Sequence, residues 1–146
     1  MNKITLKQVT EKEWKDVAIL EKKSASKTFK AFNREDDVKK YIKNSQVFFI
    51  ILDKEKIGTV SFEKEKNSIH FNGLTILKKY RKQGLGSKAI KKVLDKIKDK
   101  KKLYLVVHPE NNSAIIVYLK SGFKIKEWKN NYFGDGEARL LLKLDD

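Results

Sequence analysis

The 146-residue sequence contains no cysteine, one proline and only two histidines. The absence of cysteine excludes disulfide bonds, thiolate metal sites and a cysteine nucleophile, and two histidines leave little from which to build a metal centre. Long apolar runs are also missing. The longest, residues 47–52, is far too short to span a bilayer, and the first residues show no signal-peptide-like stretch. We therefore expect a cytoplasmic protein with no metal and no membrane partner.

Arginine is scarce although the chain is strongly basic. Lysine and arginine together number 34 against 19 acidic residues, for a net charge of +15, yet the only arginines are Arg34, Arg81 and Arg139. Specific recognition of nucleic acid favours the planar guanidinium group, and the lysines here are interleaved with acids. This pattern indicates a solvated surface and no specific nucleic-acid partner. A basic nucleic-acid-binding domain without catalysis is the alternative.

With 40% hydrophobic residues, the chain can form one domain of ordinary size, predicted to span residues 1–146. Apolar periodicity, a capping-box pattern at Thr10 and Glu13, and turn signals predict an alternating order of elements, βααβββαβαββ, in a mixed α/β (α+β) fold. A helical crossover should make the fifth strand parallel to the fourth. The expected strands are 4–8, 47–52, 57–62, 68–77, 103–107, 123–128 and 137–144, and the expected helices begin near 10 and cover 34–43, 87–97 and 112–120.

The most informative stretch joins the strand ending at residue 77 to the helix that follows. It reads Arg81, Lys82, Gln83, Gly84, Leu85, Gly86, Ser87. Backbone N–H groups at a helix start lack intrahelical partners and lie at the positive end of the helix dipole, so this turn can hold a phosphate. The spacing excludes a phosphate loop of the GxxxxGK[ST] kind. It fits the dinucleotide pattern GxGxxA, but too few βα units follow for that fold.

Together with other segments, the turn resembles the GNAT family of N-acetyltransferases. The resemblance rests on Arg81-x-x-Gly84-x-Gly86, on residues 74–76 before it, and on residues 111–118 and 121–123 after it. With the element order, it covers nearly the whole chain. The resemblance implies a mostly antiparallel sheet with two splayed parallel central strands, acetyl-coenzyme A as cosubstrate, and no metal.

The resemblance also implies which residues hold the cofactor. The main chain of Leu74, Thr75 and Ile76 would bind the pantetheine arm as an extra strand would. The pyrophosphate would lie on the N–H groups of Gln83, Gly84, Leu85, Gly86 and Ser87, with Arg81 and Lys82 supplying charge. Asn111 would contact the cofactor arm through its amide. A plain helix N-cap is an alternative role for Asn111, and both roles are compatible.

Two side chains are the candidate catalytic residues. Tyr118 matches the family tyrosine whose hydroxyl protonates or stabilises the leaving thiolate, although an aromatic residue at this helical position also suits core packing. His70 occupies the strand position where many members carry a glutamate. Imidazole is suited to accept a proton near neutral pH. The alternatives for the base are a water relay and Glu63.

The acceptor is predicted to be a primary amine, attacking the thioester directly. In the family its pocket is built by the first two helices, their connection and the last hairpin. Aromatic and acidic side chains in these segments suit a small cationic amine: Phe29, Phe32, Tyr41, Trp128, Tyr132, Phe133, Glu35, Asp36, Asp37 and Asp135. Residues 131–138 resemble a stretch of family members that acetylate protein N-termini, so a peptide α-amine is the alternative. We expect a monomer or a homodimer.

Overall fold

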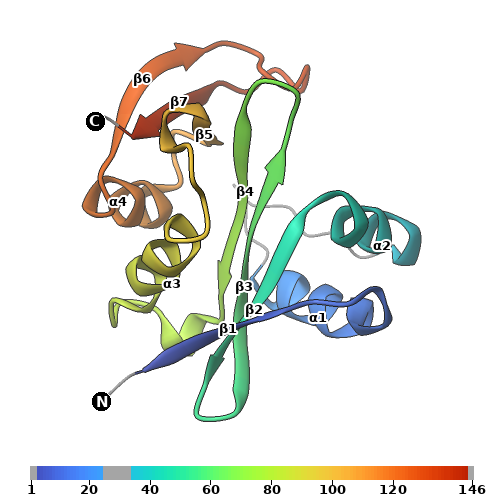
Figure 1. Cartoon of the computed structure of the whole chain (residues 1–146). Coiled ribbons are helices and arrows are strands. Elements are labelled where there is room, and N and C mark those ends of the chain that lie inside the picture. The colour runs from blue at the N-terminus through green and yellow to red at the C-terminus, as the bar shows by residue number, and fades with distance from the viewer. Residues whose placement is uncertain (1–2, 25–33, 145–146) are drawn as a thin grey trace.

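The structure is a computed structural model that describes residues 3–24 and 34–144 (Figure 1). Its strands form a seven-stranded sheet in the order β1-β2-β3-β4-β5-β7-β6. All neighbouring pairs are antiparallel except β4 and β5, which are parallel. The strands are β1 Ile4–Gln8, β2 Gln46–Leu52, β3 Glu55–Lys64, β4 Ile69–Ile76, β5 Leu103–Val107, β6 Phe123–Lys129 and β7 Arg139–Leu144.

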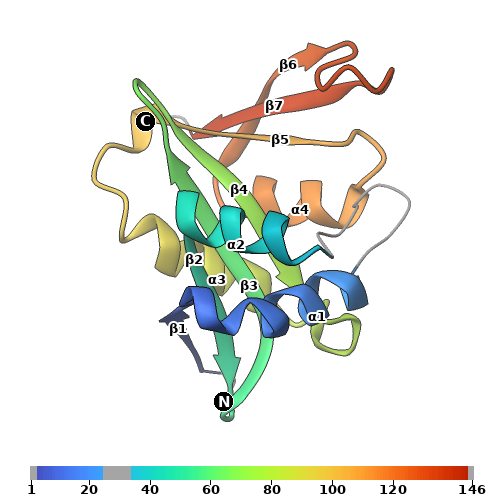
Figure 2. The ribbon, with the colours of Figure 1, turned by 90° about the vertical axis from the view of Figure 1, so that its right-hand side faces the viewer.

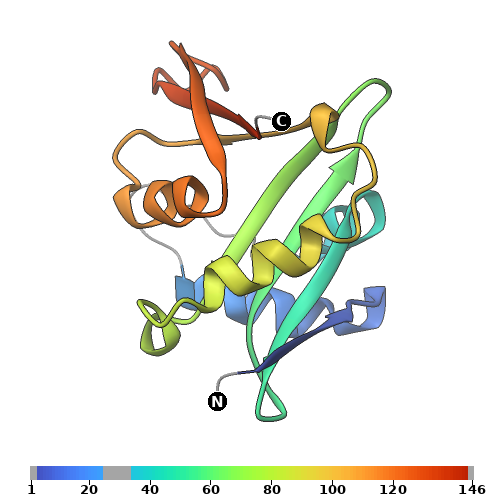
Figure 3. The same ribbon diagram turned by 60° about the vertical axis from the view of Figure 1, so that its left-hand side comes forward.

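Helices cover both faces of this sheet (Figures 2 and 3). The α-helices are α1 Trp14–Ser24, α2 Glu35–Asn44, α3 Leu85–Leu94 and α4 Asn112–Lys120, with short 3₁₀ helices at Glu11–Glu13, Lys78–Tyr80 and Lys100–Lys102. The alternation along β2 shows why two layers form. Val47 and Phe49 pack with α1 and α2, whereas Phe48 and Ile50 pack with α3 and the larger core on the other face.

The predicted element order and the mixed, mostly antiparallel sheet are confirmed. The three-stranded meander β2–β4 and the parallel pairing of β5 with β4 are confirmed as well. The bounds predicted for α3 were wrong at both ends. It begins at Leu85 because Gly84, in the left-handed region at φ 76°, already caps it, and beyond Leu94 the chain tightens into three-residue turns.

The first helical region begins as the capping box predicts. The backbone N–H of Thr10 donates to the Glu13 carboxylate at 3.0 Å, and a single 3₁₀ turn then leads into α1. On α2, Val38 and Ile42 are buried. Phe29 and Phe32 lie outside the described residues. Among the helices that the structure describes, none has the length and apolar character needed to cross a membrane.

Candidate active site

The two parallel strands β4 and β5 stay together only at their beginnings. Ile69 pairs with Leu103 and His70 with Tyr104; past these two pairs, no backbone pairing joins the strands in the described chain. Figure 2 shows them diverging from this point. The following residues of β4 are paired only with β3, and those of β5 only with β7. One edge of β4 therefore carries backbone N–H and C=O groups without a strand partner.

A bulge in β4 sorts its side chains onto the two faces of the sheet. Between the pairs Ser61–Gly73 and Glu63–His70, β4 has one residue more than β3. As a result, Phe71 and Leu74, three residues apart, both pack in the core beneath α3 and α4. The intervening Asn72 extends to the α2 face, where it lines a cavity. The strand β4 thus has an apolar side, toward α3 and α4, and a polar side, toward α2.

The turn from β4 to α3 is tied back to the end of the strand. The Nε–H of Arg81 donates to the carbonyl of Ile76 at 2.9 Å. Lys82 and Gly84 both have positive φ, at 63° and 76°. A β-carbon on Gly84 would meet no atom within 4 Å, so a glycine is favoured here by the left-handed backbone and not by lack of room. The space over the α3 N-terminus is open. This geometry is suited to an anion.

Gly86 plays a different part from Gly84. It is buried, and a β-carbon there would lie 3.3 Å from Cγ1 of Val117 and 3.5 Å from Cδ1 of Ile76. Its lack of a side chain lets the first turn of α3 pack closely against β4 and α4. Of the two glycines in the motif, only Gly84 faces the open space.

Asn111 and Tyr118 begin and anchor α4. The Asn111 side chain accepts a hydrogen bond from the backbone N–H of Ala114 at 3.4 Å, which is the N-cap arrangement. The ring of Tyr118 is buried and makes edge contacts with Phe71 and Phe123 at centroid distances of 5.8 and 5.9 Å. Burial raises the pKa of its phenol. Because its pKa is raised, Tyr118 stays protonated at neutral pH. Its hydroxyl has no hydrogen-bond partner among the residues described.

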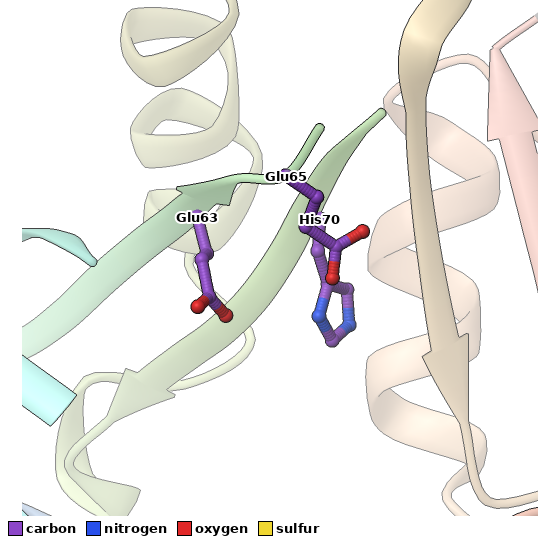
Figure 4. Close-up of side chains that lie close together, drawn as sticks. All are labelled: Glu63, Glu65 and His70. Atoms are coloured by element: carbon purple, nitrogen blue, oxygen red, sulfur yellow. The ribbon is translucent and has the colours of Figure 1, made fainter. Parts of the chain in front are cut away.

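His70 and Glu63, the two predicted candidates for the base, lie together with a third group that the sequence did not reveal. Imidazole nitrogen and carboxylate oxygens of Glu63, Glu65 and His70 lie within 4.8 Å of one another. Figure 4 shows these side chains extending to the same side of the β3–β4 pair. Neighbouring carboxylates are common without an ion, so this spacing by itself is not evidence for a metal site.

The environment of His70 has opposing effects on its basicity. The imidazole is half-buried and stacks on the ring of Tyr104, with centroids 4.7 Å apart and planes 2° from parallel. Burial lowers the pKa of His70, and the charges of Glu65 and Glu63 partly oppose this by raising it. The lowered pKa keeps the imidazole neutral, and able to accept a proton, at neutral pH.

A cavity of about 380 Å³ adjoins Glu63 on the α2 face. Three of its lining residues are joined by hydrogen bonds, directly or through the buried Ser61. The Ser61 hydroxyl donates to the Asn72 amide oxygen at 2.6 Å and shares a hydrogen bond with Tyr41, and the Asn72 amide donates to the Ser45 hydroxyl at 2.9 Å. The lining of the cavity therefore carries acidic, hydroxyl and amide groups together with the amine of Lys40. It is lined by Asp37, Lys40, Tyr41, Asn44, Ser45, Glu63 and Asn72.

Only some of the predicted acceptor-side residues meet at this cavity. Asp37 and Tyr41 do, whereas Trp128 and Phe133 are exposed on or beside the β6–β7 hairpin and Asp135 pairs with Arg139 at 2.9 Å. Four other lining residues were not predicted from the sequence: Lys40, Asn44, Ser45 and Asn72. An asparagine beside a glycine inside a predicted strand, as at 72–73, is a signal of a bulge that could have indicated Asn72.

A buried carboxyl group on α1 was also missed. Glu21 is 3% exposed and accepts a hydrogen bond from the Thr75 hydroxyl at 3.4 Å. Burial raises its pKa to about 7. Glu21 follows the buried Val17 by four residues, so both lie on the same face of α1. This spacing is the one sequence signal for the burial of Glu21.

A model of the acetyltransferase (GNAT) family matches residues 9–123. The chain belongs to this family. Among curated proteins, the spermidine N(1)-acetyltransferase of Escherichia coli K12 is 32% identical over 104 residues, covering 66% of this GNAT chain and 55% of that protein. An N-alpha-acetyltransferase of Sulfurisphaera tokodaii is 32% identical over 76 residues, covering 50% and 46%. The matches thus span about half the length of these curated relatives.

Solved structures confirm the GNAT fold over the whole chain. A GNAT family acetyltransferase from Elizabethkingia anophelis with acetyl-CoA bound superposes with a TM-score of 0.75 and covers 98% of both chains at 21% identity. At this identity the likeness concerns the fold. It confirms the predicted family architecture, in which the parallel central strands separate.

Proposed function

We propose that this GNAT chain transfers the acetyl group of acetyl-coenzyme A to a primary amine by direct attack on the thioester. The observation that carries the proposal is the continuity of two features. The unpaired edge of β4 leads, through the turn anchored by Arg81, to the open left-handed glycine at the N-terminus of α3. An extended, amide-containing chain ending in a pyrophosphate suits both parts.

The residues present fit such a cosubstrate. The backbone of Leu74, Thr75 and Ile76 offers hydrogen-bonding groups to the pantetheine amides. The N–H groups of residues 83–87 are directed to the pyrophosphate, with Lys82 and the outer nitrogens of Arg81 supplying charge, since only its Nε is used by the Ile76 carbonyl. Asn111 caps α4 and offers its NH₂ group to the cofactor arm, because its oxygen takes the capping bond.

The chain's own groups then handle the protons. Acetyl-coenzyme A supplies an activated thioester. His70 accepts a proton from the acceptor ammonium, and the free amine forms the N–C bond as the C–S bond breaks. A main-chain N–H of residues 74–76 stabilises negative charge on the carbonyl oxygen. Tyr118 donates a proton to the sulfur and is reprotonated by the second proton that the nitrogen loses. The proton on His70 leaves to solvent, so an ammonium and a thioester give an amide, a thiol and one proton.

We favour a small cationic amine as acceptor. The cavity next to Glu63, which itself lies close to His70, is lined by the carboxylates of Asp37 and Glu63 and by Tyr41, together with Lys40, in a protein of net charge +15. Concentrated acidic groups on a basic molecule suit an ammonium ligand. The similarity to a spermidine acetyltransferase supports the same class.

A peptide α-amine is the second candidate. The similarity to an N-alpha-acetyltransferase supports it, as do the exposed Tyr132 and Phe133 after β6. Comparing polyamines with short peptides of free and blocked N-termini, at equal concentration, separates the two classes by initial rate.

The cofactor site is tested by placing a charge on Gly84. Gly84→Asp should raise the Kd for acetyl-coenzyme A by about 100-fold, because the carboxylate would occupy the space over the α3 N-terminus and repel the pyrophosphate. Gly84→Asn, of nearly the same shape, should raise it by about tenfold or less. Isothermal titration calorimetry at fixed salt measures both.

Gly134→Asp is the matched control. Gly134 has φ 78° and, like Gly84, no atom within 4 Å of its β-carbon position, so the backbone penalty is the same while the α3 N-terminus is untouched. Its acetyl-coenzyme A affinity should equal that of the wild type. Equal affinities for Gly84→Asp and Gly134→Asp would show that the pyrophosphate does not bind at this turn.

A further inference from the structure

The imidazole of His70 is held in one orientation by elements that are distant in sequence. Because β4 and β5 are parallel and His70 pairs with Tyr104, their side chains lie on the same face and their rings stack. Stacking at 4.7 Å with nearly parallel planes restricts rotation of the imidazole. These are also the last paired residues before the strands diverge, so the ring lies where the opening between β4 and β5 begins.

The carboxylate of Glu65, in the turn after β3, is held in place by two hydrogen bonds. Its Oε1 accepts hydrogen bonds from the Tyr104 hydroxyl at 2.8 Å and from the Ser68 hydroxyl at 2.7 Å. These bonds lower the pKa of Glu65, the Ser68 bond most, so its carboxylate is ionised at neutral pH. Tyr104 thus contacts both members of the pair: its ring stacks on His70 and its hydroxyl holds Glu65.

We propose that Glu65, held by Tyr104, is a positioning residue whose carboxylate stabilises the imidazolium formed when the acceptor ammonium gives up its proton, while the stacked ring of Tyr104 fixes the orientation of His70. The inference rests on the proposed function and deepens it. Glu65 does not contact the acceptor in this account. It acts through His70 by its charge, because its carboxylate lies within 4.8 Å of an imidazole nitrogen.

The other groups around His70 define what the test must separate. Glu63 on β3 also lies close to the imidazole, and Tyr104 on β5 stacks against it. Tyr132, after β6, contributes to raising the pKa of Tyr104. Glu63 lines the acceptor cavity, so changing it would alter acceptor binding as well. Glu65 does not line that cavity, which makes Glu65→Gln the cleaner variant.

The test combines an NMR titration with kinetics. The chain has two histidines, so the imidazole C–H signals are assigned with a His108→Gln variant, and His108 then serves as the internal reference. Removing the Glu65 charge should move the pKa of His70 downward, because that charge raises it. In parallel, kcat/KM at pH 7 should fall about tenfold and its acid limb should move to lower pH, with KM for acetyl-coenzyme A unchanged. Tyr104→Phe should act in the same direction by a smaller amount.

The matched control is Glu55→Gln. Glu55 also accepts a hydrogen bond from a tyrosine hydroxyl, that of Tyr80, but it lies at the other end of β3 from the His70 cluster. Glu55→Gln should leave the pKa of His70 and the acid limb of kcat/KM unchanged. An unshifted His70 pKa in Glu65→Gln, or a shifted pKa with unchanged kcat/KM, would overturn the inference. If the wild type releases no thiol with any amine while the His70 pKa still responds to Glu65, the proposed function has failed and the electrostatic coupling stands.

Discussion

At the scale of single residues, the molecule places ionisable groups where burial changes their protonation. Glu21 on α1 and His70 on β4 are both shifted toward their neutral forms by burial. The sequence predicted His70 as a candidate base because its position could be counted from a motif. It could not predict Glu21, because a glutamate on a lysine-rich helix is usually solvated, and only the packing of α1 against β4 makes it buried.

Replacing Glu21 tests this burial. The pKa of Glu21 is raised from 4.5 to about 7, so the folded state holds its proton more tightly than the unfolded state and loses stability as pH rises from 4.5 through 7. Glu21→Gln removes that loss. Relative to wild type, its free energy of unfolding should therefore rise by about 2–3 kcal/mol between pH 4.5 and pH 8. Urea unfolding at the two pH values measures the difference.

The exposed Glu11, in the turn before α1, provides the control. Glu11→Gln should show the same pH dependence of stability as the wild type. If Glu21→Gln also followed the wild-type curve from pH 4.5 to 8, the carboxyl would not be titrating in a buried site.

At the scale of elements, the sequence predicted what depends on local pattern. Strand and helix order followed from apolar periodicity and turn residues, and the parallel β4–β5 pair followed from the helical crossover. The bulge in β4 and the position of β7 between β5 and β6 were not predicted, since both depend on which strands pair across the sheet. The bulge matters most for the site, because it places Phe71 and Leu74, three residues apart, on the same face of the sheet.

The close approach of β3 to β4 gives an element-scale prediction. A β-carbon on Gly58 would fall on the carbonyl oxygen of Thr75, a backbone atom that cannot move without shifting β4. Gly58→Ala should therefore destabilise the fold by about 3 kcal/mol or more. Thermal and urea unfolding measure this loss.

Gly136→Ala is a suitable comparison for that variant. Gly136 has open space around its β-carbon position and φ 82°, so only the left-handed backbone penalty of about 1–2 kcal/mol applies. Similar losses for the two variants would show that β3 and β4 are not held together as closely as the structure has them.

At the scale of the whole molecule, the sheet consists of β1–β4 and of β5, β7 and β6, joined through two backbone pairs. The opening between these parts has an apolar, α3–α4 side that leads to the glycine turn and a polar, α2 side that leads to the acidic cavity. The two faces of this opening therefore offer different environments, one apolar and one with acidic and hydroxyl groups. A motif in the sequence predicted the glycine turn and the acidic residues of α2, whereas the cavity that joins Asp37 to Glu63 and Asn72 depends on how α2 packs on the sheet.

Thiol release from acetyl-coenzyme A is the direct test of whether this chain acetylates amines. Purified chain is mixed with acetyl-coenzyme A and either spermidine, a peptide with a free N-terminus or the same peptide blocked, and thiol formation is followed together with the mass of the acceptor. The account predicts thiol release that depends on a free amine, with one acetyl group added per thiol and the highest kcat/KM for the small cationic amine. A folded protein that binds acetyl-coenzyme A yet acetylates none of these amines would contradict it.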